Sequence, residues 1–449
     1  MTFYIGSISA SMSRSEDFRK VISEWFLQEL PVTFDRDISV PFSVNPVVSI
    51  VGPRRSGKTF LMYSMIKKLR ERLNPQNILY VDFEHERLRN LDANDLSDMI
   101  AVYYEISGVD QKGDMYLFLD EIQVVNGWSK WVNRMYETKE FHIYLSGSSS
   151  KLLSRELSTE LRGRSIDFTV LPYSFSEYLR ANATRIDNLE FLLRSEKRGY
   201  ITRSLMQYIK FGGFPEVVFI GDGREKLLRS YVDTIIIKDV GERFRIEPSV
   251  LSVFYSYAIS TYSKYFSGTK TYNFLKSLNY KISRDFPLEL MDHFKEVFAL
   301  FEVEIFSPSL KPRKQNPRKL YVADTGIINT SIGNLEMGRL IENLVFLELC
   351  RRSDCFAQFR VNYWKEYGKA EGREVDFVVV EGNRITQLIN VTYASSRKDI
   401  PEREIQGLLK ASEELKCKRM RVITWDYYEQ GEIEFTPLWY WLLESGKSA

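Results

Sequence analysis

A glycine-rich octapeptide near the start of the chain has the residue types of a phosphate-binding loop. Residues 52–59 fit the spacing G-x-x-x-x-G-K-[ST] and lie between an apolar run and a helix-like segment. The glycines let backbone N–H groups turn toward phosphates, Lys58 can neutralise β and γ oxygens, and the Thr59 hydroxyl is a ligand for Mg²⁺. Arg54 and Arg55 are either phosphate contacts or solvated loop charges. The predicted binding residues are Gly52, Pro53, Arg54, Arg55, Ser56, Gly57, Lys58 and Thr59.

Two adjacent carboxylates, Asp120 and Glu121, end the apolar run that begins at residue 115. Ligands gather at the carboxyl ends of strands in open α/β sheets, so this position favours a role in the same site. Asp120 is predicted to hold Mg²⁺ through water, and Glu121 to orient and polarise an attacking water molecule. The alternative is an acidic turn on the surface.

Polar and basic residues after the next apolar run are further candidates. Ser146 and Ser148 can hydrogen-bond a γ-phosphate or the attacking water, or cap a helix expected at 150–162. Arg162 and Arg164 follow at the end of that helix. They are candidates for an arginine finger that reaches a neighbouring subunit, or they are ordinary charges at a helix C-terminus.

The elements that must position these residues alternate along the first 171 residues. Short apolar runs occur at 46–53, 77–83, 115–121, 141–147 and 165–171. Four of them are separated by segments long enough for a helix, so the pattern predicts a parallel sheet with helices on both faces. An apolar stripe with helical spacing also predicts an amphipathic helix over residues 14–30.

The rest of the chain divides by pattern into three further parts. The predicted domains are a nucleotide-binding domain over 1–171, a helical lid over 172–245, a winged helix over 246–330 and an α/β domain over 331–449. The winged helix is indicated by three helical segments and two strand-like segments that flank a basic loop. The predicted class is therefore α/β, with a parallel-sheet domain at its start.

Composition excludes several classes of protein. Lys and Arg total 62 against 60 Asp and Glu, so a nucleic-acid site must be a local patch and not a whole-molecule field. The three cysteines form no C-x-x-C pattern, which argues against a disulfide framework and a zinc site. We find no secretory signal and no run of 18 apolar residues, and so we expect a cytoplasmic protein without a membrane partner.

The motifs together resemble the prokaryotic, archaeal-type AAA ATPases. The likeness rests on GPRRSGKT, FLDEIQVVNGW, SGSSSKLLSRELSTELRGRSIDFTVLPYSFSEYL and FGGFPEVV, and it continues through LYVADTGIIN, GRLIENLVFLEL and REVDFVVV over nearly the whole chain. It implies ATP binding and hydrolysis, an oligomer and a place near nucleic acid. It makes Asp120 and Glu121 the metal and water residues and Ser146 to Ser148 the polar sensor. FGGFPEVV lacks the arginine that many AAA proteins carry on the lid as a second sensor.

The same resemblance implies a C-terminal domain similar to PD-(D/E)XK nucleases. Such a site needs a helix glutamate, a strand aspartate, and a glutamate and lysine two apart on the next strand. Glu342 and Asp376 match the first two, although Glu342 is equally well explained as a solvated helix glutamate. Asn390 and Thr392 stand where the glutamate and lysine are expected. Thr392 cannot supply a cation, so we expect a degenerate site with little or no cleavage.

A basic, proline-containing segment lies between the two strand-like segments of the predicted winged helix. Its cations are Lys311, Arg313, Lys314, Arg318 and Lys319. Clustered cations on an extended hairpin can follow a phosphate backbone, so we expect nucleic-acid contact here, with DNA as the expected partner. A solvated charged loop is the alternative.

Three functions therefore compete. The leading one is a Mg²⁺-dependent, DNA-associated ATPase that uses its nucleotide state to change conformation or assembly. The alternatives are an ATP-dependent nuclease with a degenerate C-terminal site and a nucleotide-gated scaffold that recruits other proteins.

Overall fold

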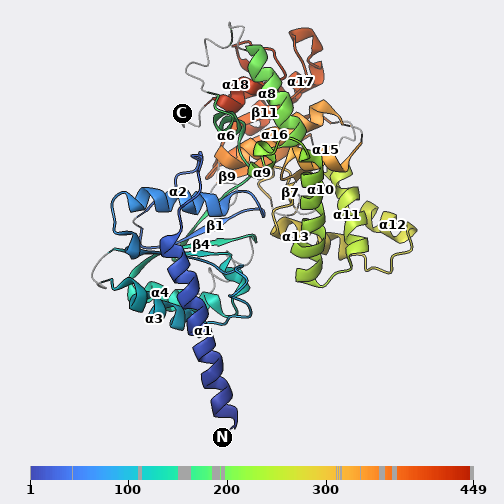
Figure 1. Ribbon diagram of the computed structural model, residues 1–449. Coiled ribbons are helices and arrows are strands. Elements are labelled where there is room, and N and C mark those ends of the chain that lie inside the picture. The colour runs from blue at the N-terminus through green and yellow to red at the C-terminus, as the bar shows by residue number, and fades with distance from the viewer. Residues whose placement is uncertain are drawn as a thin grey trace. The chain divides into compact units, whose positions relative to one another are not determined.

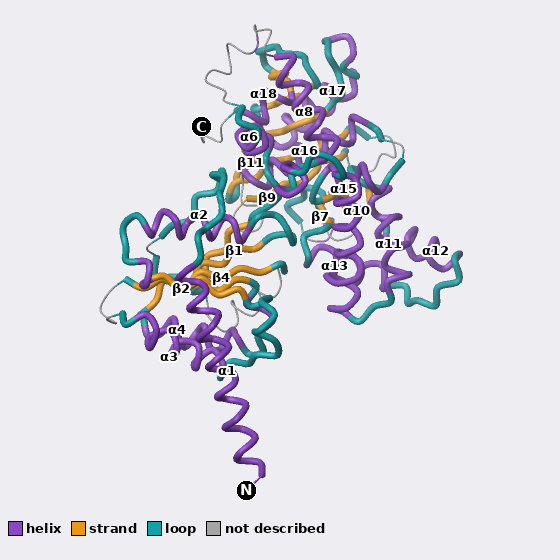
Figure 2. The backbone as a smooth tube through the Cα atoms, in the orientation of Figure 1, coloured by secondary structure: helices purple, strands orange, loops and turns teal. Residues whose placement is uncertain are grey.

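The chain folds into two compact units, Met1–Val170 and Leu171–Ala449. The computed structural model describes residues 2–42, 44–109, 114–149, 163–184, 193, 198–309, 311, 313, 316–333, 335–352, 359–366 and 372–444. Figure 1 labels the elements, and Figure 2 separates helices from strands and loops. Among the described helices, none is long and apolar enough to cross a membrane.

The first unit is built on a five-stranded parallel sheet. Its strands are β1 (Val47–Val51), β2 (Ile78–Asp82), β3 (Met115–Asp120), β4 (Phe141–Gly147) and β5 (Ser165–Thr169). Their order in the sheet is β2-β3-β4-β1-β5, and every pairing is parallel. The five apolar runs are therefore the five strands, and the predicted parallel α/β fold is confirmed.

Helices connect these strands and cover the sheet. They are α2 (Lys58–Arg70), η1 (Pro75–Asn77), α3 (Asp95–Ser107), η2 (Ile122–Val124) and α4 (Trp128–Thr138). Figure 1 shows α2 on one side of the sheet and α3 and α4 on the other. Strands β1 to β4 are mostly apolar and almost entirely buried, because helices cover both faces of the sheet, whereas the edge strand β5 is partly exposed.

The N-terminal helix α1 (Thr2–Leu27) adds a further apolar face to this unit. Phe18 and Ile22 are fully buried, as the helical stripe predicts. Trp25 is also buried, and its indole N–H donates to Ile78 O at 2.8 Å. The helix is thereby joined to the edge strand β2, whose side chains enter the nucleotide site.

The second unit begins with helices. They are α6 (Phe175–Ala181), α8 (Arg198–Phe211), α9 (Pro215–Phe219), α10 (Arg224–Thr234), the π-helical η4 (Ile235–Glu242), α11 (Pro248–Ser260), α12 (Gly268–Ser277) and α13 (Phe286–Glu296). Ser174 and Glu177 form a capping box that fixes the start of α6. Ser267 caps α12 by accepting from the backbone N–H of Lys270.

A small antiparallel sheet combines one strand between α11 and α12 with two strands after α13. It consists of β6 (Tyr265–Phe266), β8 (Arg318–Val322) and β7 (Leu300–Val303), in that order. The two strand-like segments of the sequence are β7 and β8, and β6 is a short addition that sequence patterning missed. Because β8 is the central strand, it pairs with β6 along one edge and with β7 along the other.

The last part of the second unit is a mixed sheet with helices. Its elements are α15 (Thr325–Ser331), α16 (Met337–Arg352), β9 (Phe359–Lys365), β10 (Glu374–Glu381), β11 (Arg384–Val391), η5 (Arg397–Asp399), α17 (Glu402–Leu415), β12 (Met420–Thr424), β13 (Ile433–Pro437) and α18 (Leu438–Leu443). The strand order is β13-β12-β11-β10-β9, parallel over β11 to β13 and antiparallel elsewhere.

A buried aspartate joins two motifs of the second unit that are far apart in sequence. Asp324 accepts from the backbone N–H of Gly213 and of Gly326, each at 2.8 Å. Gly212 has φ +75°, and a Cβ there would lie 1.7 Å from a carboxylate oxygen of Asp324. Gly212 of FGGFP is therefore required by the close approach of this carboxylate, whereas a Cβ on Gly213 would lie 2.3 Å from Tyr173 O.

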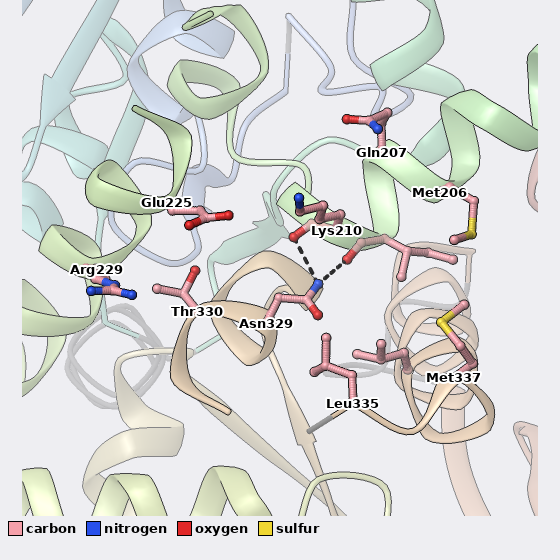
Figure 3. Close-up of a pocket in the computed structure, with 11 residues that line it drawn as sticks. Met206, Gln207, Lys210, Glu225, Arg229, Asn329, Thr330, Leu335 and Met337 are labelled. Carbon is pink, nitrogen blue, oxygen red and sulfur yellow. Dashed lines mark hydrogen bonds between the residues drawn. The ribbon is translucent and has the colours of Figure 1, made fainter. Parts of the chain in front are cut away.

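A cavity of about 380 Å³ lies where α8, α10, α15 and α16 meet in the second unit (Figure 3). Asn329 spans part of it and donates to the carbonyls of Ile209 and Lys210 at 2.7 and 2.9 Å. These bonds satisfy the C-terminal turn of α8. The cavity is thus framed by helix packing, and none of the sequence-predicted site residues lines it.

Candidate functional site

The loop between β1 and α2 is shaped by its two glycines. Gly52 has φ +151°, and a Cβ there would lie 2.2 Å from Val170 O. Gly57 has φ +99° and directly precedes α2, so the helix begins at Lys58 with its N-terminus at the loop. A helix start beside a glycine-rich turn is a favourable place for an anion.

Lys58 is buried in this loop, with 4% of its surface exposed. Its ammonium donates to the carbonyls of Gly52 and Pro53, both at 3.2 Å, and lies 3.5 Å from Glu121 Oε1. The structure therefore brings the loop lysine and the predicted water-activating carboxylate together, although 63 positions separate them in sequence. A buried cation held this loosely by carbonyls can exchange them for phosphate oxygens.

The Asp120 carboxylate accepts hydrogen bonds from hydroxyl groups on three different elements. Its Oδ2 accepts from Thr59 Oγ1 at 2.6 Å and from Tyr80 OH at 2.8 Å. Its Oδ1 accepts from Ser146 Oγ. Burial raises the pKa of Asp120, and the adjacent Glu121 carboxylate acts in the same direction. A bound cation would compensate this desolvated carboxylate.

Glu121 has a positive φ angle, and its surroundings favour the ionised form of its side chain. Its φ is +51°, in the left-handed region, where the chain leaves β3. Burial would raise the pKa of this carboxyl, but the Lys58 ammonium and a hydrogen bond from Gln123 outweigh burial, and the pKa is lowered. Glu121 is therefore a charged base at neutral pH. Its backbone N–H donates to Ser146 Oγ at 3.0 Å, which fixes the turn.

The residues present fit ATP with Mg²⁺. The Thr59 hydroxyl and the Asp120 carboxylate are adjacent oxygen donors, the ligand type that Mg²⁺ prefers. Ser56 is fully buried in the loop, and its Oγ has no hydrogen-bond partner among the described residues. A buried hydroxyl of this kind is satisfied when a phosphate oxygen accepts from it.

The other predicted residues of this site are less directly placed. Arg54 pairs with Glu84 at 3.0 Å, while Arg55 is exposed with φ +66°. Ser148 directly follows β4, and its side chain is buried. Arg162 and the helix expected at 150–162 lie outside the described residues.

Arg164 lies just before β5. It forms an ion pair with Glu137 at 3.2 Å, and its guanidinium carbon lies 5.4 Å from the ring centre of Tyr136. Its side chain is nevertheless 44% exposed. The structure therefore places Arg164 at the surface of its own unit, held by contacts that are weak in water.

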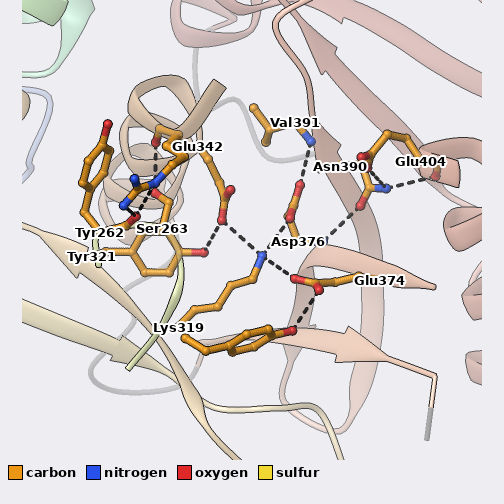
Figure 4. A network of polar contacts seen from close by, with 12 residues as sticks. Tyr262, Ser263, Lys319, Tyr321, Glu342, Glu374, Asp376, Asn390, Val391 and Glu404 are labelled. Carbon is orange, nitrogen blue, oxygen red and sulfur yellow. Dashed lines mark hydrogen bonds and ion pairs between the residues drawn. The ribbon is translucent and has the colours of Figure 1, made fainter. Parts of the chain in front are cut away.

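A second polar cluster forms in the C-terminal part of the chain (Figure 4). Glu342 of α16 and Asp376 of β10 come together as predicted, but they meet around Lys319 of β8. Asn390 accepts from the Asp376 backbone N–H at 3.0 Å and donates to Glu404 at 2.9 Å, so its amide is already engaged. Thr392 pairs through its backbone N–H with Ile423 O on β12.

The predicted basic loop does not hold together as one exposed patch. Lys311 is exposed, and Lys314 lies outside the described residues. Arg318 is paired with Glu302 at 2.6 Å and Glu304 at 3.4 Å. These contacts arise because Arg318 belongs to β8, which pairs with β7; Glu302 lies on β7 and Glu304 directly follows it.

The placement of Lys319 on an exposed loop is wrong. The residue is 4% exposed and pairs with three carboxylates. Successive residues of a strand point to opposite faces, so Lys319 faces away from the side taken by Arg318. It is unavailable to a phosphate backbone.

Sequence reasoning missed several residues of both clusters. Tyr80 and Asp82 lie on β2, beside β3 in the sheet, and burial raises the pKa of Asp82 to about 6. The sequence could have indicated Asp82, because the apolar run at 77–83 also carries a carboxylate near its end. Glu374 stands two residues before Asp376 on one strand face, and Tyr321 stands two after Lys319.

Three family models match the chain. One is described as an AAA domain and matches residues 44–179. The others are described as domains of unknown function, DUF8612 over residues 202–337 and DUF4143 over residues 337–441. The first match contains the phosphate-binding loop, Asp120 and Glu121.

Whole-chain relatives have also been found. The chain is 34% identical over 424 residues to the uncharacterized protein MJ1544 of Methanocaldococcus jannaschii, which covers 91% of each chain. It is 28% identical over 406 residues to an uncharacterized protein of Haemophilus influenzae, covering 88% of this chain and 94% of that one. The solved structure of AMPPCP-bound DnaA from Aquifex aeolicus aligns over 62% of this chain and 92% of that chain, at 15% identity. The TM-score of this alignment is 0.23.

Proposed function

The chain belongs to the AAA-type ATPase family, and on that basis we propose that it binds ATP with Mg²⁺ and hydrolyses it at the site formed by Lys58, Thr59, Asp120 and Glu121. One observation carries the proposal. The ends of β1 and β3 bring a buried lysine to 3.5 Å from a charged glutamate and a threonine hydroxyl to 2.6 Å from a buried aspartate. This is the set of groups that phosphoryl transfer to water requires.

Each group has a separate task in this proposal. Lys58 binds β and γ oxygens, while Thr59 and Asp120 hold the ion. Mg²⁺, when bound, neutralises the charge of the phosphates. Glu121 accepts a proton from the attacking water, for which its lowered pKa keeps it ionised. Ser146 contacts both Asp120 and the backbone of Glu121, and so it positions the two acids.

Phosphate release from ATP by the full chain tests the proposal. We expect turnover with Mg²⁺ and its loss when EDTA removes the ion. The absence of turnover with Mg²⁺, despite measured ATP binding, would favour the nucleotide-gated scaffold.

We expect hydrolysis to need a neighbouring copy of the chain. Arg164 is exposed and held by Glu137, so it can exchange that partner for a phosphate of another subunit. Arg164→Ala should lower turnover by about 10³-fold, the smallest effect typical of an arginine finger. Glu137→Gln keeps the arginine, removes its present partner, and should leave turnover near the wild-type level.

Mixing experiments separate this role from a structural one. Arg164→Ala and Lys58→Ala proteins are each inactive alone, but in a mixture one interface has an intact loop and an intact arginine. Turnover should partly return. A monomeric mass, together with wild-type activity in Arg164→Ala protein, would contradict the idea.

A basic cavity supports the association with nucleic acid. It has a volume of about 610 Å³ and lies in the second unit. Its lining includes Arg313, Arg360, Arg384 and Lys416, and no carboxylate belongs to that lining. Arg313 Nε is buried without a hydrogen-bond partner among the described residues. Several cations around a cavity whose lining has no carboxylate favour phosphate, so we propose that a DNA backbone binds here.

Neutralising the cavity should change the salt dependence of DNA binding. In the Arg313→Ala, Arg360→Ala, Arg384→Ala triple variant, the slope of log affinity against log salt should flatten by about 0.9 per lost phosphate contact. Fluorescence anisotropy with duplex DNA measures this slope. Lys238→Ala, which removes an exposed charge outside the cavity, is the control. An unchanged slope in the triple variant would remove this support for DNA binding.

The rest of the second unit is proposed to transmit the nucleotide state. Residues 172–245 would act as a lid and 246–330 as a winged helix, with nucleotide turnover changing conformation or assembly. The ATP-dependent nuclease is the weaker alternative. The amide oxygen of Asn390 already accepts from the backbone N–H of Asp376, and its NH₂ group donates to Glu404.

A further inference from the structure

Three carboxylates of the second unit converge on one ammonium group. Lys319 Nζ lies 2.7 Å from Glu374 Oε1, 2.8 Å from Asp376 Oδ1 and 3.2 Å from Glu342 Oε1 (Figure 4). An ammonium group has three N–H donors, so each donor has one carboxylate. The three acids come from α16 and β10, whereas the lysine comes from β8.

Each carboxylate is also held by a second donor. Tyr321 OH donates to Glu342 at 2.8 Å, and Tyr265 OH donates to Glu374 at 2.8 Å. The backbone N–H of Val391 donates to Asp376 Oδ2 at 3.0 Å. The acids are therefore oriented toward a common point by groups other than the lysine.

The cluster as built does not fit a divalent metal ion. Lys319 fills the point of convergence, and its N–O distances are those of charge-assisted hydrogen bonds. Among the described residues, no group of three or more histidine, cysteine, aspartate or glutamate side chains has the geometry of a metal site. A second cation beside the ammonium would be repelled at close range.

The charges nevertheless leave the cluster acidic. One ammonium faces three carboxyl groups, two on β10 and one on α16. An excess of oriented oxygen ligands around a single cation is the arrangement that a divalent ion requires. The cation in place is a lysine side chain.

We propose that Lys319 is a built-in cation that takes the place of a divalent metal ion among the carboxylates of Glu342, Glu374 and Asp376. The ion pairs of Lys319 thereby connect β8 to α16 and β10, and the ammonium group prevents a metal ion from binding between the three carboxylates. All four residues belong to the second unit, whereas the nucleotide loop belongs to the first.

Mn²⁺ binding to nucleotide-free full-length protein tests the proposal, with free Mn²⁺ counted by electron paramagnetic resonance. Lys319→Ala should bind one more Mn²⁺ per chain than wild type. The dissociation constant of this additional ion should be at least tenfold lower than that of any Mn²⁺ that wild type binds outside the nucleotide loop. The Lys319→Ala, Asp376→Asn double variant should lose this ion. Any Mn²⁺ held at Asp120 is common to all three proteins and cancels in the comparison.

Melting temperature gives a second measurement, because Lys319→Ala leaves three acids unpaired and should melt earlier than wild type. Mn²⁺ should raise the melting temperature of Lys319→Ala and leave those of wild type and of the double variant unchanged. If Lys319→Ala folds only with Mn²⁺ present, the proposal holds. A folded Lys319→Ala protein with no extra Mn²⁺, or an unfolded one that Mn²⁺ does not recover, overturns it.

Discussion

Lys58→Ala protein should bind ATP roughly 10- to 100-fold more weakly than wild type and should show no measurable turnover. A charge-assisted hydrogen bond is worth about 1.5–3 kcal/mol, and Lys58 is the buried cation of the loop. Its loss also removes the group that lowers the pKa of Glu121, so the remaining carboxylate is less readily ionised. Binding of a fluorescent ATP analogue and release of phosphate measure the two effects.

Lys68→Ala is the matched control for this variant. Lys68 lies on the same helix, but it is 56% exposed and pairs with Asp35 at the surface. Its replacement should leave binding and turnover unchanged. If Lys58→Ala protein binds ATP as tightly as the control does, the loop is not the phosphate site.

Glu121→Gln protein should keep ATP binding and lose turnover by about 10²- to 10⁴-fold, the usual contribution of a general base. Glutamine keeps the size of the side chain but cannot take a proton from water. The contact of Asp120 with Thr59 is untouched, so binding of the nucleotide with its ion should persist. The comparison therefore separates a chemical role for Glu121 from a role in binding.

Glu84→Gln provides the control for the loss of a carboxylate near the loop. Glu84 pairs with Arg54 and is 41% exposed, so its neutralisation should change turnover little. Turnover at the wild-type level in Glu121→Gln protein would show that another group activates the water. Asp82, whose pKa is raised to about 6, would then be the next residue to replace.

The nucleotide site was predictable because its parts are local. The loop is contiguous in sequence, and each acid follows an apolar run directly. In a parallel sheet the carboxyl ends of all strands share one edge, so these residues had to lie near one another. The sequence did not reveal that β3 lies between β2 and β4, and for this reason Tyr80 was missed as a donor to Asp120.

The basic segment shows where the sequence was insufficient. Five cations over nine positions suggested one exposed patch, yet Arg318 and Lys319 point to different acidic partners. The spacing of charged residues along a chain does not predict which of their side chains are buried when the segment forms a strand. That depends on which distant segments pair with the strand, and here β8 is central in its sheet.

The parallel α/β architecture and the phosphate-binding loop could be predicted from the amino-acid sequence, because the hydrophobic period and the glycine spacing act over a few residues. Tertiary structure alone decided the pairing of Lys58 with Glu121 and the insertion of Lys319 among Glu342, Glu374 and Asp376. In each case a buried charge is tolerated only when opposite charges from distant segments meet it. Those partners are set by strand order and helix packing, which no local pattern encodes.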